Sequence, residues 1–317
     1  MKVIDLINDT ASVPFSFEVL PPLKGNGTSG LFDTIDRLRE FQPRYINITA
    51  HRSEYVYKDL PNGLVQKQRI RRRPGSIAVA AAIQRRYDIP VVPHLVCSGN
   101  TREDLEYTLL DLQFLDISDL LVLRGDKARD ERMFQPTGDG PSHATELIEQ
   151  INRFNEGYFF DGSPINQPGV PFAFGVACYP EKHEEAPNLE ADMEILLRKA
   201  QMGAEYAVTQ LFFDNERYFR FVRRAREMGI TIPIVPGIKP LTKLNQLSMV
   251  PKTFHCDLPE ALRLEAVKCQ TDAEVQQLGI EWATEQCREL LRQGAPNLHF
   301  YSMGAVDSIC EIAKRIY

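Results

Sequence analysis

The sequence is poor in the features that mark several large protein classes. Its 317 residues include one tryptophan, six histidines and six cysteines, and no two cysteines form a Cys-x-x-Cys pair. Scattered cysteines in a chain of this length argue against a disulfide-dependent scaffold. The close pairs His94 with Cys97 and His255 with Cys256 have no matching second half, so we expect no bound metal.

Long apolar runs and an excess of basic charge are also missing. The longest uncharged apolar run, residues 77–83, is far shorter than the roughly 20 residues of a membrane helix. Asp5 and Asp9 interrupt the apolar stretch that a secretion signal would need. The 37 lysines and arginines against 43 aspartates and glutamates leave a net charge of −6. We therefore expect a cytoplasmic protein that binds neither nucleic acid nor membranes.

Apolar, β-rich runs alternate with amphipathic segments along the whole chain. The expected strands are residues 15–20, 45–49, 91–95, 119–123, 172–177, 206–211, 234–237 and 297–301. The expected helices are residues 31–41, 76–87, 102–115, 144–155, 189–202, 216–228, 243–249 and 306–316. Eight such units suit a closed parallel barrel, because each parallel neighbour needs a crossover connection. We predict one α/β domain over residues 1–317, a (β/α)8 TIM barrel with extra loops and helices.

The chain is longer than the roughly 250 residues that such a barrel needs, and the additional residues lie in four segments. They are residues 52–74, 127–142, 156–171 and 251–292. We interpret the basic run 67–73 as a solvated loop or helix face, and expect helices of its own in the last segment. Residues 25–30 match G-x-G-x-x-G, but Pro21 and Pro22 separate them from the preceding strand and no acid ends the next one. This motif is therefore interpreted as a flexible loop.

Polar residues at the ends of predicted strands are candidates for chemistry, because barrel active sites form there. Burial of Glu18 would raise its pKa and suit a proton donor, although an ion pair with a barrel lysine or arginine is the alternative. His94 could bind a cofactor or a backbone carbonyl. Gln210 could meet the edge of a heteroaromatic ligand. Lys239 could form a Schiff base if it is desolvated.

Six motifs then occur in one order along the chain. They are Phe17-Glu18-x-x-Pro21-Pro22, Pro93-His94-Leu95, Leu123-Arg124-Gly125-Asp126, Tyr179-Pro180-Glu181-x-His183-x-Glu185-Ala186, Thr209-Gln210-x-Phe212-Phe213-Asp214 and Pro236-Gly237-Ile238. From about residue 14 to residue 317 this series resembles the methylenetetrahydrofolate reductase family. The resemblance implies a (β/α)8 barrel that holds FAD and takes hydride from NADH or NADPH. It also implies ping-pong reduction of 5,10-methylenetetrahydrofolate to 5-methyltetrahydrofolate, within folate one-carbon metabolism and methionine biosynthesis.

The resemblance also assigns roles by position. Glu18 is similar to the general acid that protonates the folate bridge. Asp126 is similar to a catalytic residue near flavin and pterin that hydrogen-bonds the pterin and tunes the charge of the flavin. Gln210 and Gln246 correspond to folate-contacting positions. The positions similar to FAD contacts are Thr49, His94, Arg124, Gly125, Asp126, Ala144, Tyr179, His183, Ala186, Asp192, Arg198 and Lys199. Arg198 and Lys199 point about 100° apart on a helix, so only one of them is expected to face the diphosphate.

Three positions depart from the pattern of this family. Ala50 and His143 stand where many relatives have tyrosine, and Ala305 stands where many bacterial relatives have a basic residue that meets the folate. The chain ends directly after the eighth unit, so we expect no C-terminal regulatory domain. Small molecules and further copies of the chain, as a homo-oligomer, are the expected partners. Two alternatives are a Schiff-base aldolase that uses Lys239 and a flavin- or folate-binding protein without turnover.

Overall fold

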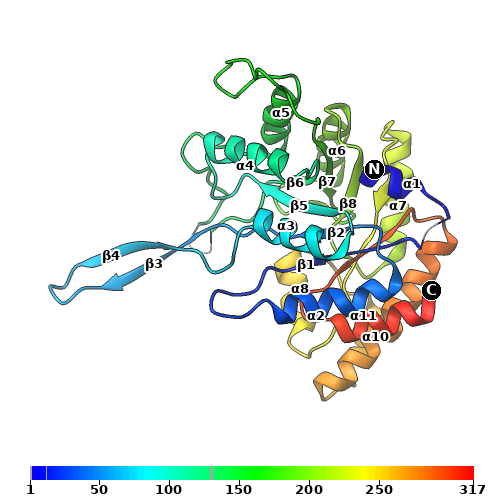
Figure 1. Cartoon of the computed structure of the whole chain (residues 1–317). Helices are drawn as coiled ribbons and strands as arrows, with labels where there is room; N and C mark the ends of the chain where they lie inside the picture. Colours follow the sequence, from blue (N-terminus) through cyan, green and yellow to red (C-terminus); the bar gives the residue numbers. More distant parts are fainter. Residues whose placement is uncertain (1, 12, 129–130) are drawn as a thin grey trace. The chain divides into compact units, whose positions relative to one another are not determined.

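Strands and helices alternate along the chain as predicted (Figure 1). The computed structural model describes residues 2–11, 13–128 and 131–317. Its strands are β1 (Phe15–Val19), β2 (Ile46–Ile48), β3 (Glu54–Asp59), β4 (Val65–Ile70), β5 (Val91–Val96), β6 (Asp119–Leu123), β7 (Ala173–Cys178), β8 (Tyr206–Thr209), β9 (Ile234–Val235), β10 (Gly237–Ile238) and β11 (Leu298–Tyr301). Its α-helices are α1 (Val3–Asn8), α2 (Ser29–Leu38), α3 (Ser76–Tyr87), α4 (Arg102–Phe114), α5 (Ala144–Asn155), α6 (Leu189–Gln201), α7 (Asn215–Glu227), α8 (Gln246–Phe254), α9 (Glu260–Ala266), α10 (Asp272–Arg292) and α11 (Val306–Ile316). Within these described residues, no helix combines the length and the apolar character that crossing a membrane requires.

The order of the strands follows the order of the chain. The hydrogen-bonded order in the main sheet is β10-β11-β1-β2-β5-β6-β7-β8-β9. The pairs β1–β11, β10–β11, β5–β6, β7–β8 and β8–β9 are all parallel. The strands at the two ends of this order, β9 and β10, are separated in the chain by Pro236 alone, which has no N–H to donate to a ladder. They are two halves of the predicted seventh strand, so the prediction of a (β/α)8 fold is confirmed.

The chain folds as two compact units. One comprises Met1–Val19, Phe32–Asn47 and Ala173–Tyr317, and the other comprises Leu20–Leu31 and Ile48–Phe172. The first unit contains β1 and β7–β11, and the second contains β3–β6 with α3–α5. The assignment of residues 1–317 to a single domain stays a prediction.

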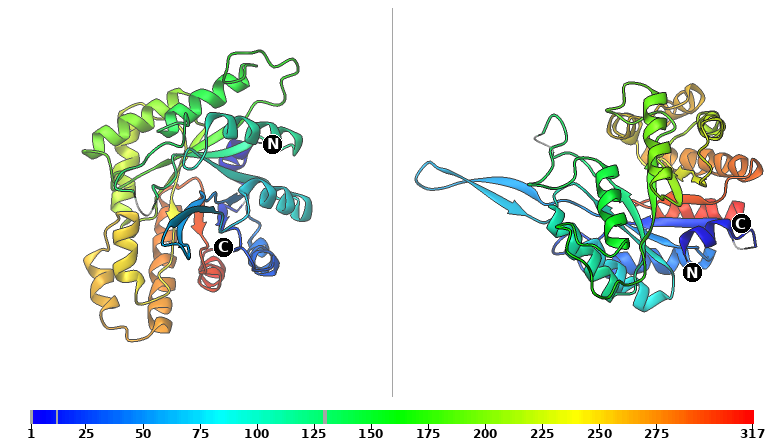
Figure 2. Two further views of the ribbon diagram at one scale, coloured as in Figure 1. Left: turned by 90° about the vertical axis from the view of Figure 1, so that its left-hand side faces the viewer. Right: turned by 90° about the horizontal axis from the view of Figure 1, so that it is seen from above.

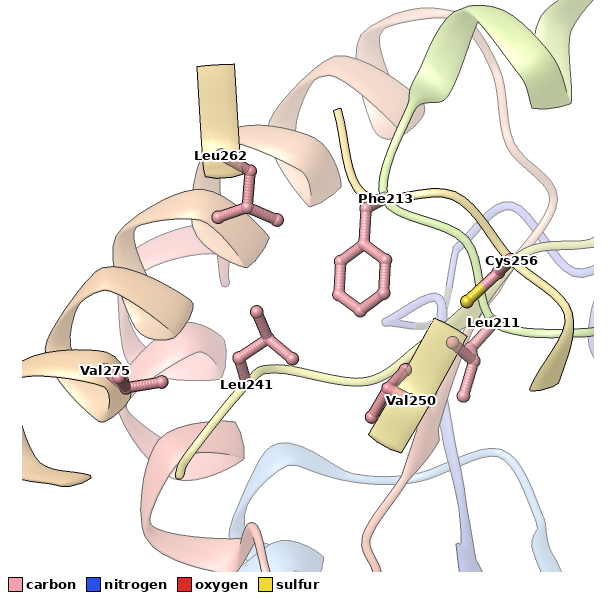
Figure 3. Close-up of a cluster of buried hydrophobic side chains, with 7 residues drawn as sticks. All are labelled: Leu211, Phe213, Leu241, Val250, Cys256, Leu262 and Val275. Atoms are coloured by element: carbon pink, nitrogen blue, oxygen red, sulfur yellow. The ribbon is translucent and has the colours of Figure 1, made fainter. Parts of the chain in front are cut away.

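The predicted extra helices of the first unit pack around their own apolar cluster. Its buried members are Leu211, Phe213, Leu241, Val250, Cys256, Leu262 and Val275 (Figure 3). They come from the segments after β8 and β10, from α8, α9 and α10, and from the segment between α8 and α9. A Cβ atom added to Gly279 of α10 would lie 2.0 Å from the carbonyl oxygen of Leu241. The long helix α10 therefore reaches backbone contact with this segment because glycine stands at the crossing.

The start of α10 carries a capping box. The Oγ1 atom of Thr271 accepts a hydrogen bond of 3.2 Å from the N–H of Glu274, whose carboxylate accepts one of 3.0 Å from the N–H of Thr271. We expect Thr271→Ala to lower the free energy of unfolding by about 1 kcal/mol, because a backbone donor loses its partner. Urea unfolding measures this loss. The control Thr271→Ser keeps the hydroxyl, and equal stability of the serine and alanine variants would contradict the prediction.

One interpretation made from the sequence is wrong. Residues 65–70 of the basic segment form β4, which pairs antiparallel with β3, rather than a loop or helix face. Figures 1 and 2 show this hairpin extending away from α3 and α4 of the same unit. Its turn contains Asn62-Gly63, and Gly63 has a φ of +77°, which favours glycine. A two-stranded ribbon exposed on both faces tolerates alternating charges, so apolar patterning alone does not reveal it.

Other differences concern boundaries and one loop. The short helix α1 was not predicted, and α8 begins and ends later than expected and contains Pro251. Residues 25–28 of the glycine-rich motif are confirmed as a loop, whereas Ser29 and Gly30 begin α2. A Cβ atom added at Gly25, Gly27 or Gly30 would have no heavy atom within 4 Å. Gly30 therefore lacks the close helix–strand packing that gives the third glycine of a dinucleotide fingerprint its role.

Candidate functional site

A buried carboxyl group and a buried amine lie at strand ends of the first unit. Glu18 of β1 is 7% exposed, and burial raises its pKa to about 8 although the charge of Lys239 opposes the shift. Lys239 follows β10 and is 5% exposed, and burial lowers its pKa to about 8 while Glu18 opposes the shift. At neutral pH the carboxyl of Glu18 therefore keeps its proton, as a general acid requires. Lys239 is also the cation that a structural role for Glu18 would need.

Hydrogen bonds fix the strand ends around this carboxyl group. The hydroxyl of Ser302 donates to the carbonyl oxygen of Glu18 at 2.6 Å. The hydroxyl of Tyr301 donates to the backbone carbonyl oxygen of Thr209, also at 2.6 Å. The N–H of Gly237 donates to Oγ1 of Thr209 at 2.9 Å. Sequence reasoning missed Tyr301, Thr209 and Ser302. Gly237 of the Pro-Gly-Ile motif was the one signal in the sequence that a neighbouring side chain packs closely there. A Cβ atom at Gly237 would lie 2.6 Å from the ring of Tyr301.

Two glutamines named from the sequence lie in the same unit. The N–H of Gln210, the residue after β8, donates to the carbonyl oxygen of Cys178 at 2.8 Å. Its side-chain oxygen accepts from the N–H of Leu211 at 2.9 Å. Gln246 is buried at the start of α8, and its side-chain oxygen accepts from the N–H of Thr242 at 2.7 Å. Each amide oxygen thus has a local donor, which sets the orientation of the amide group.

The loop after β7 brings together several predicted FAD positions. The N–H of His183 donates to the carboxylate of Asp192 at 2.9 Å, and the rings of Tyr179 and His183 meet edge to face with centroids 4.8 Å apart. The ammonium group of Lys182, whose φ is +79°, donates to the carbonyl oxygen of Ala186 at 3.0 Å. This loop is therefore held in one conformation by its own side chains and by α6.

The structure also separates the two consecutive basic residues of α6. Lys199 is half-buried and donates to the carbonyl oxygen of Ala177 in β7 at 3.2 Å. Arg198 is exposed. The expectation that they point in different directions is confirmed. Arg198 is the one presented to solvent.

The second unit carries the other predicted cofactor positions. Oγ1 of Thr49 lies 3.1 Å from Nε2 of His51, just after β2. His94 in β5 is buried, and burial, reinforced by the charge of His51, lowers its pKa to about 3. Its imidazole is therefore neutral at physiological pH and can act as one donor and one acceptor. Ala144 is buried at the first residue of α5.

The loop after β6 presents a carboxylate. Gly125 has a φ of +81°, and a Cβ atom there would lie 2.8 Å from Cβ of Ser98, so only glycine fits without strain. The hydroxyl of Ser98 donates to the carbonyl oxygen of Asp126 at 2.7 Å. The guanidinium carbon of Arg124 lies 4.9 Å from the centroid of the Phe134 ring. Asp126 is exposed, so its carboxylate can reach a ligand.

Across residues 2–11, 13–128 and 131–317, no group of three or more His, Cys, Asp or Glu side chains is arranged to hold a metal ion. A (β/α)8 fold with a buried acid, a buried amine and two amides after its strands defines a barrel protein whose chemistry lies at the strand ends. A family model described as "Methylenetetrahydrofolate reductase" matches residues 3–317. The chain belongs to the methylenetetrahydrofolate reductase family.

Individual proteins agree with this assignment. A Caenorhabditis elegans protein named "Probable methylenetetrahydrofolate reductase (NADPH)" is 30% identical over 316 residues, which are 99% of this chain and 43% of that protein. The "5,10-methylenetetrahydrofolate reductase" of Salmonella typhimurium is 29% identical over 297 residues, with 92% of this chain and 86% of that protein covered. The chain thus spans about half the length of the animal and plant relatives it matches, and most of the bacterial one.

A solved structure supports the fold. It is an uncharacterized protein from Clostridium thermocellum that binds two copies of 5-methyl-5,6,7,8-tetrahydrofolic acid. The match has a TM-score of 0.55 and 15% sequence identity, and it covers 96% of this chain and 94% of that one. At this identity the likeness concerns the fold alone.

Proposed function

We propose that this chain reduces 5,10-methylenetetrahydrofolate to 5-methyltetrahydrofolate with NADH or NADPH as reductant, through bound FAD and in ping-pong fashion. The observation that carries the proposal is the buried Glu18 carboxyl, protonated at neutral pH, in a chain of the methylenetetrahydrofolate reductase family. An acid in this state can protonate a folate nitrogen without a pH below the physiological range.

The residues present suit FAD by their chemistry. An exposed arginine, Arg198, offers a cation for the diphosphate, and the ring of Tyr179 offers an apolar face. Neutral His94 and the hydroxyl of Thr49 offer hydrogen bonds to carbonyl and ribose oxygens. The remaining positions that we propose for the cofactor are Arg124, Gly125, Asp126, Ala144, His183, Ala186, Asp192 and Lys199. When bound, FAD supplies the chemistry of accepting and passing on a hydride.

Glu18 supplies the proton in this proposal. Its Oε–H donates to the bridge nitrogen of the folate, the bond from that nitrogen to the methylene carbon breaks, and the electron pair stays on the nitrogen. The methylene carbon is then part of an iminium ion and can accept hydride. Loss of the proton leaves a carboxylate at a buried site, so this step depends on the surroundings of Glu18.

The other polar side chains position the substrates in this proposal. Asp126 hydrogen-bonds the pterin, for which an exposed carboxylate on a rigid loop is suited. The amides of Gln210 and Gln246 hydrogen-bond the folate, and Gln210 also meets the amide of the nicotinamide. The local donors to their oxygens orient each amide group before a ligand arrives.

A spectrum of the purified protein tests the proposal. We expect the protein to be yellow, to bleach under anaerobic conditions with NADH or NADPH, and to regain its colour when methylenetetrahydrofolate is added. Separate titrations with the two nucleotides give the preference. Bleaching without recovery would instead identify a flavin-binding protein without folate turnover, and a colourless protein that FAD does not reconstitute would contradict the proposal.

A second candidate function remains testable because Lys239 is desolvated. Its 5% exposure and lowered pKa are the conditions that a Schiff-base lysine needs. An aldolase of this kind would be labelled at Lys239 by borohydride in the presence of a carbonyl substrate. Absence of labelling in a protein that carries out the folate reaction would exclude this function.

A further inference from the structure

The buried amine of Lys239 has no part in the proposed reaction as described so far. Its Nζ atom has no hydrogen-bond partner among the residues that the structure describes, and the residue is 5% exposed. A buried ammonium group without hydrogen bonds is costly unless an opposite charge compensates it. The carboxylate of Glu18, once it has lost its proton, supplies the charge that favours the ammonium form.

The sheet register places these two groups at one level. Glu18 of β1 pairs with Tyr301 of β11, and Ile238 of β10 pairs with Phe300 of β11. Lys239 is the residue directly after β10, and continuing the register by one residue places it level with Tyr301 and hence with Glu18. Residues in register on neighbouring parallel strands share a face, and successive residues alternate between faces. Glu18 and Lys239 therefore point to the same side of the sheet.

The intervening side chain is directed away from the pair. Tyr301 stands on the strand between them, but its hydroxyl donates to the carbonyl oxygen of Thr209 on β8. Its ring lies over Gly237, where a Cβ atom would be 2.6 Å from the ring. Burial, with Glu18 contributing, raises the pKa of Tyr301 well above its ordinary value, so the phenol stays neutral. The charge of Lys239 acts on the pKa of Glu18, and the charge of Glu18 acts on that of Tyr301, so both groups are electrostatically coupled to Glu18.

We infer that Lys239 is a positioning residue for Glu18, whose ammonium group stabilises the carboxylate left after Glu18 has given its proton to the folate. This inference rests on the proposed function. The proton moves from Glu18 to the bridge nitrogen, while the ammonium group keeps its three protons and gains a carboxylate as hydrogen-bond partner. The ammonium group of Lys239 thus lacks a hydrogen-bond partner among the described residues before proton transfer and gains an opposite charge after it, which favours the transferred state.

Kinetics of the separate half-reactions test this role. In Lys239→Met the nearby positive charge is gone, so Glu18 holds its proton more tightly. We expect the alkaline limb of the folate half-reaction to move up by about one pH unit or more, and the rate below that limb to fall at least about tenfold. Reduction of the flavin by NADH or NADPH should keep its rate and pH profile. Lys239→Arg, which keeps the charge, should leave the limb near its wild-type position.

The matched control is Lys268→Met, because Lys268 is an exposed lysine paired with Glu265 at the surface. It should leave both half-reactions unchanged. If the limb of a folded Lys239→Met protein coincides with that of the wild type, the inference is overturned.

A readout without turnover separates this inference from the proposed function. The infrared carbonyl band of protonated Glu18, identified by its loss in Glu18→Gln, should persist to higher pH in Lys239→Met. If the band shifts but the wild type does not reduce methylenetetrahydrofolate, the proposed function fails and the coupling of the two groups stands. If Lys239→Met does not fold, the reciprocal titration decides: in Glu18→Gln, the 13Cε resonance of Lys239 should titrate at lower pH, and an unchanged titration overturns the inference.

Discussion

Replacing Glu18 by glutamine is expected to slow methylenetetrahydrofolate reduction by about a hundredfold or more while NADH or NADPH still reduces the flavin. Glutamine has nearly the same size and can hydrogen-bond, but it has no proton to give, and a positioned acid contributes about 10²–10⁴-fold. Anaerobic stopped-flow absorbance of the flavin measures the two half-reactions separately. Equal loss in both would show that Glu18 supports the cofactor rather than the proton transfer.

The role of Glu18 as an acid also predicts how the rate of the folate half-reaction changes with pH. Since burial raises the pKa of Glu18 to about 8, the acid form needed for the folate half-reaction is present below that pH and lost above it. We expect the wild-type rate to fall as pH rises through about 8 and the residual rate of Glu18→Gln to lack that limb. Glu281→Gln is the matched control, because Glu281 is exposed and accepts a hydrogen bond from Gln277 of the same helix. A limb that survives in Glu18→Gln would assign the titration to another group.

Replacing Gly279 by alanine is expected to lower the free energy of unfolding by about 3 kcal/mol or more. The added Cβ atom would lie 2.0 Å from the carbonyl oxygen of Leu241 and 2.9 Å from its nitrogen, and neither is a flexible side-chain end. Relief requires a shift of α10, which would loosen the cluster around Leu241 and Val275 shown in Figure 3. Urea unfolding monitored by circular dichroism measures the effect.

The control for this prediction is Gly30→Ala in α2. A Cβ atom at Gly30 would have no heavy atom within 4 Å. Alanine also favours the helix, so the variant should be as stable as the wild type or gain up to about 1 kcal/mol. Similar losses in both variants would mean that the Gly279 contact is not the cause.

The sequence was sufficient for most of the fold. Each predicted strand has a counterpart in the structure, because buried strands and amphipathic helices differ in the period of their apolar residues. The hairpin of β3 and β4 was misread because both its faces are exposed and neither needs an apolar pattern. The split of the seventh strand at Pro236 also follows local chemistry, since proline cannot donate to the ladder.

By itself the sequence determined the (β/α)8 class, the family motifs and the candidate acid Glu18, because periodicity and short motifs are local properties of the chain. Only the tertiary structure decided that Lys239 and Glu18 come to one level of the sheet, that Tyr301 turns toward Thr209, and which of Arg198 and Lys199 is exposed. Those facts depend on strand register and on burial. Register brings residues more than 200 positions apart to one level, and burial sets the protonation of a carboxyl group through the water it excludes.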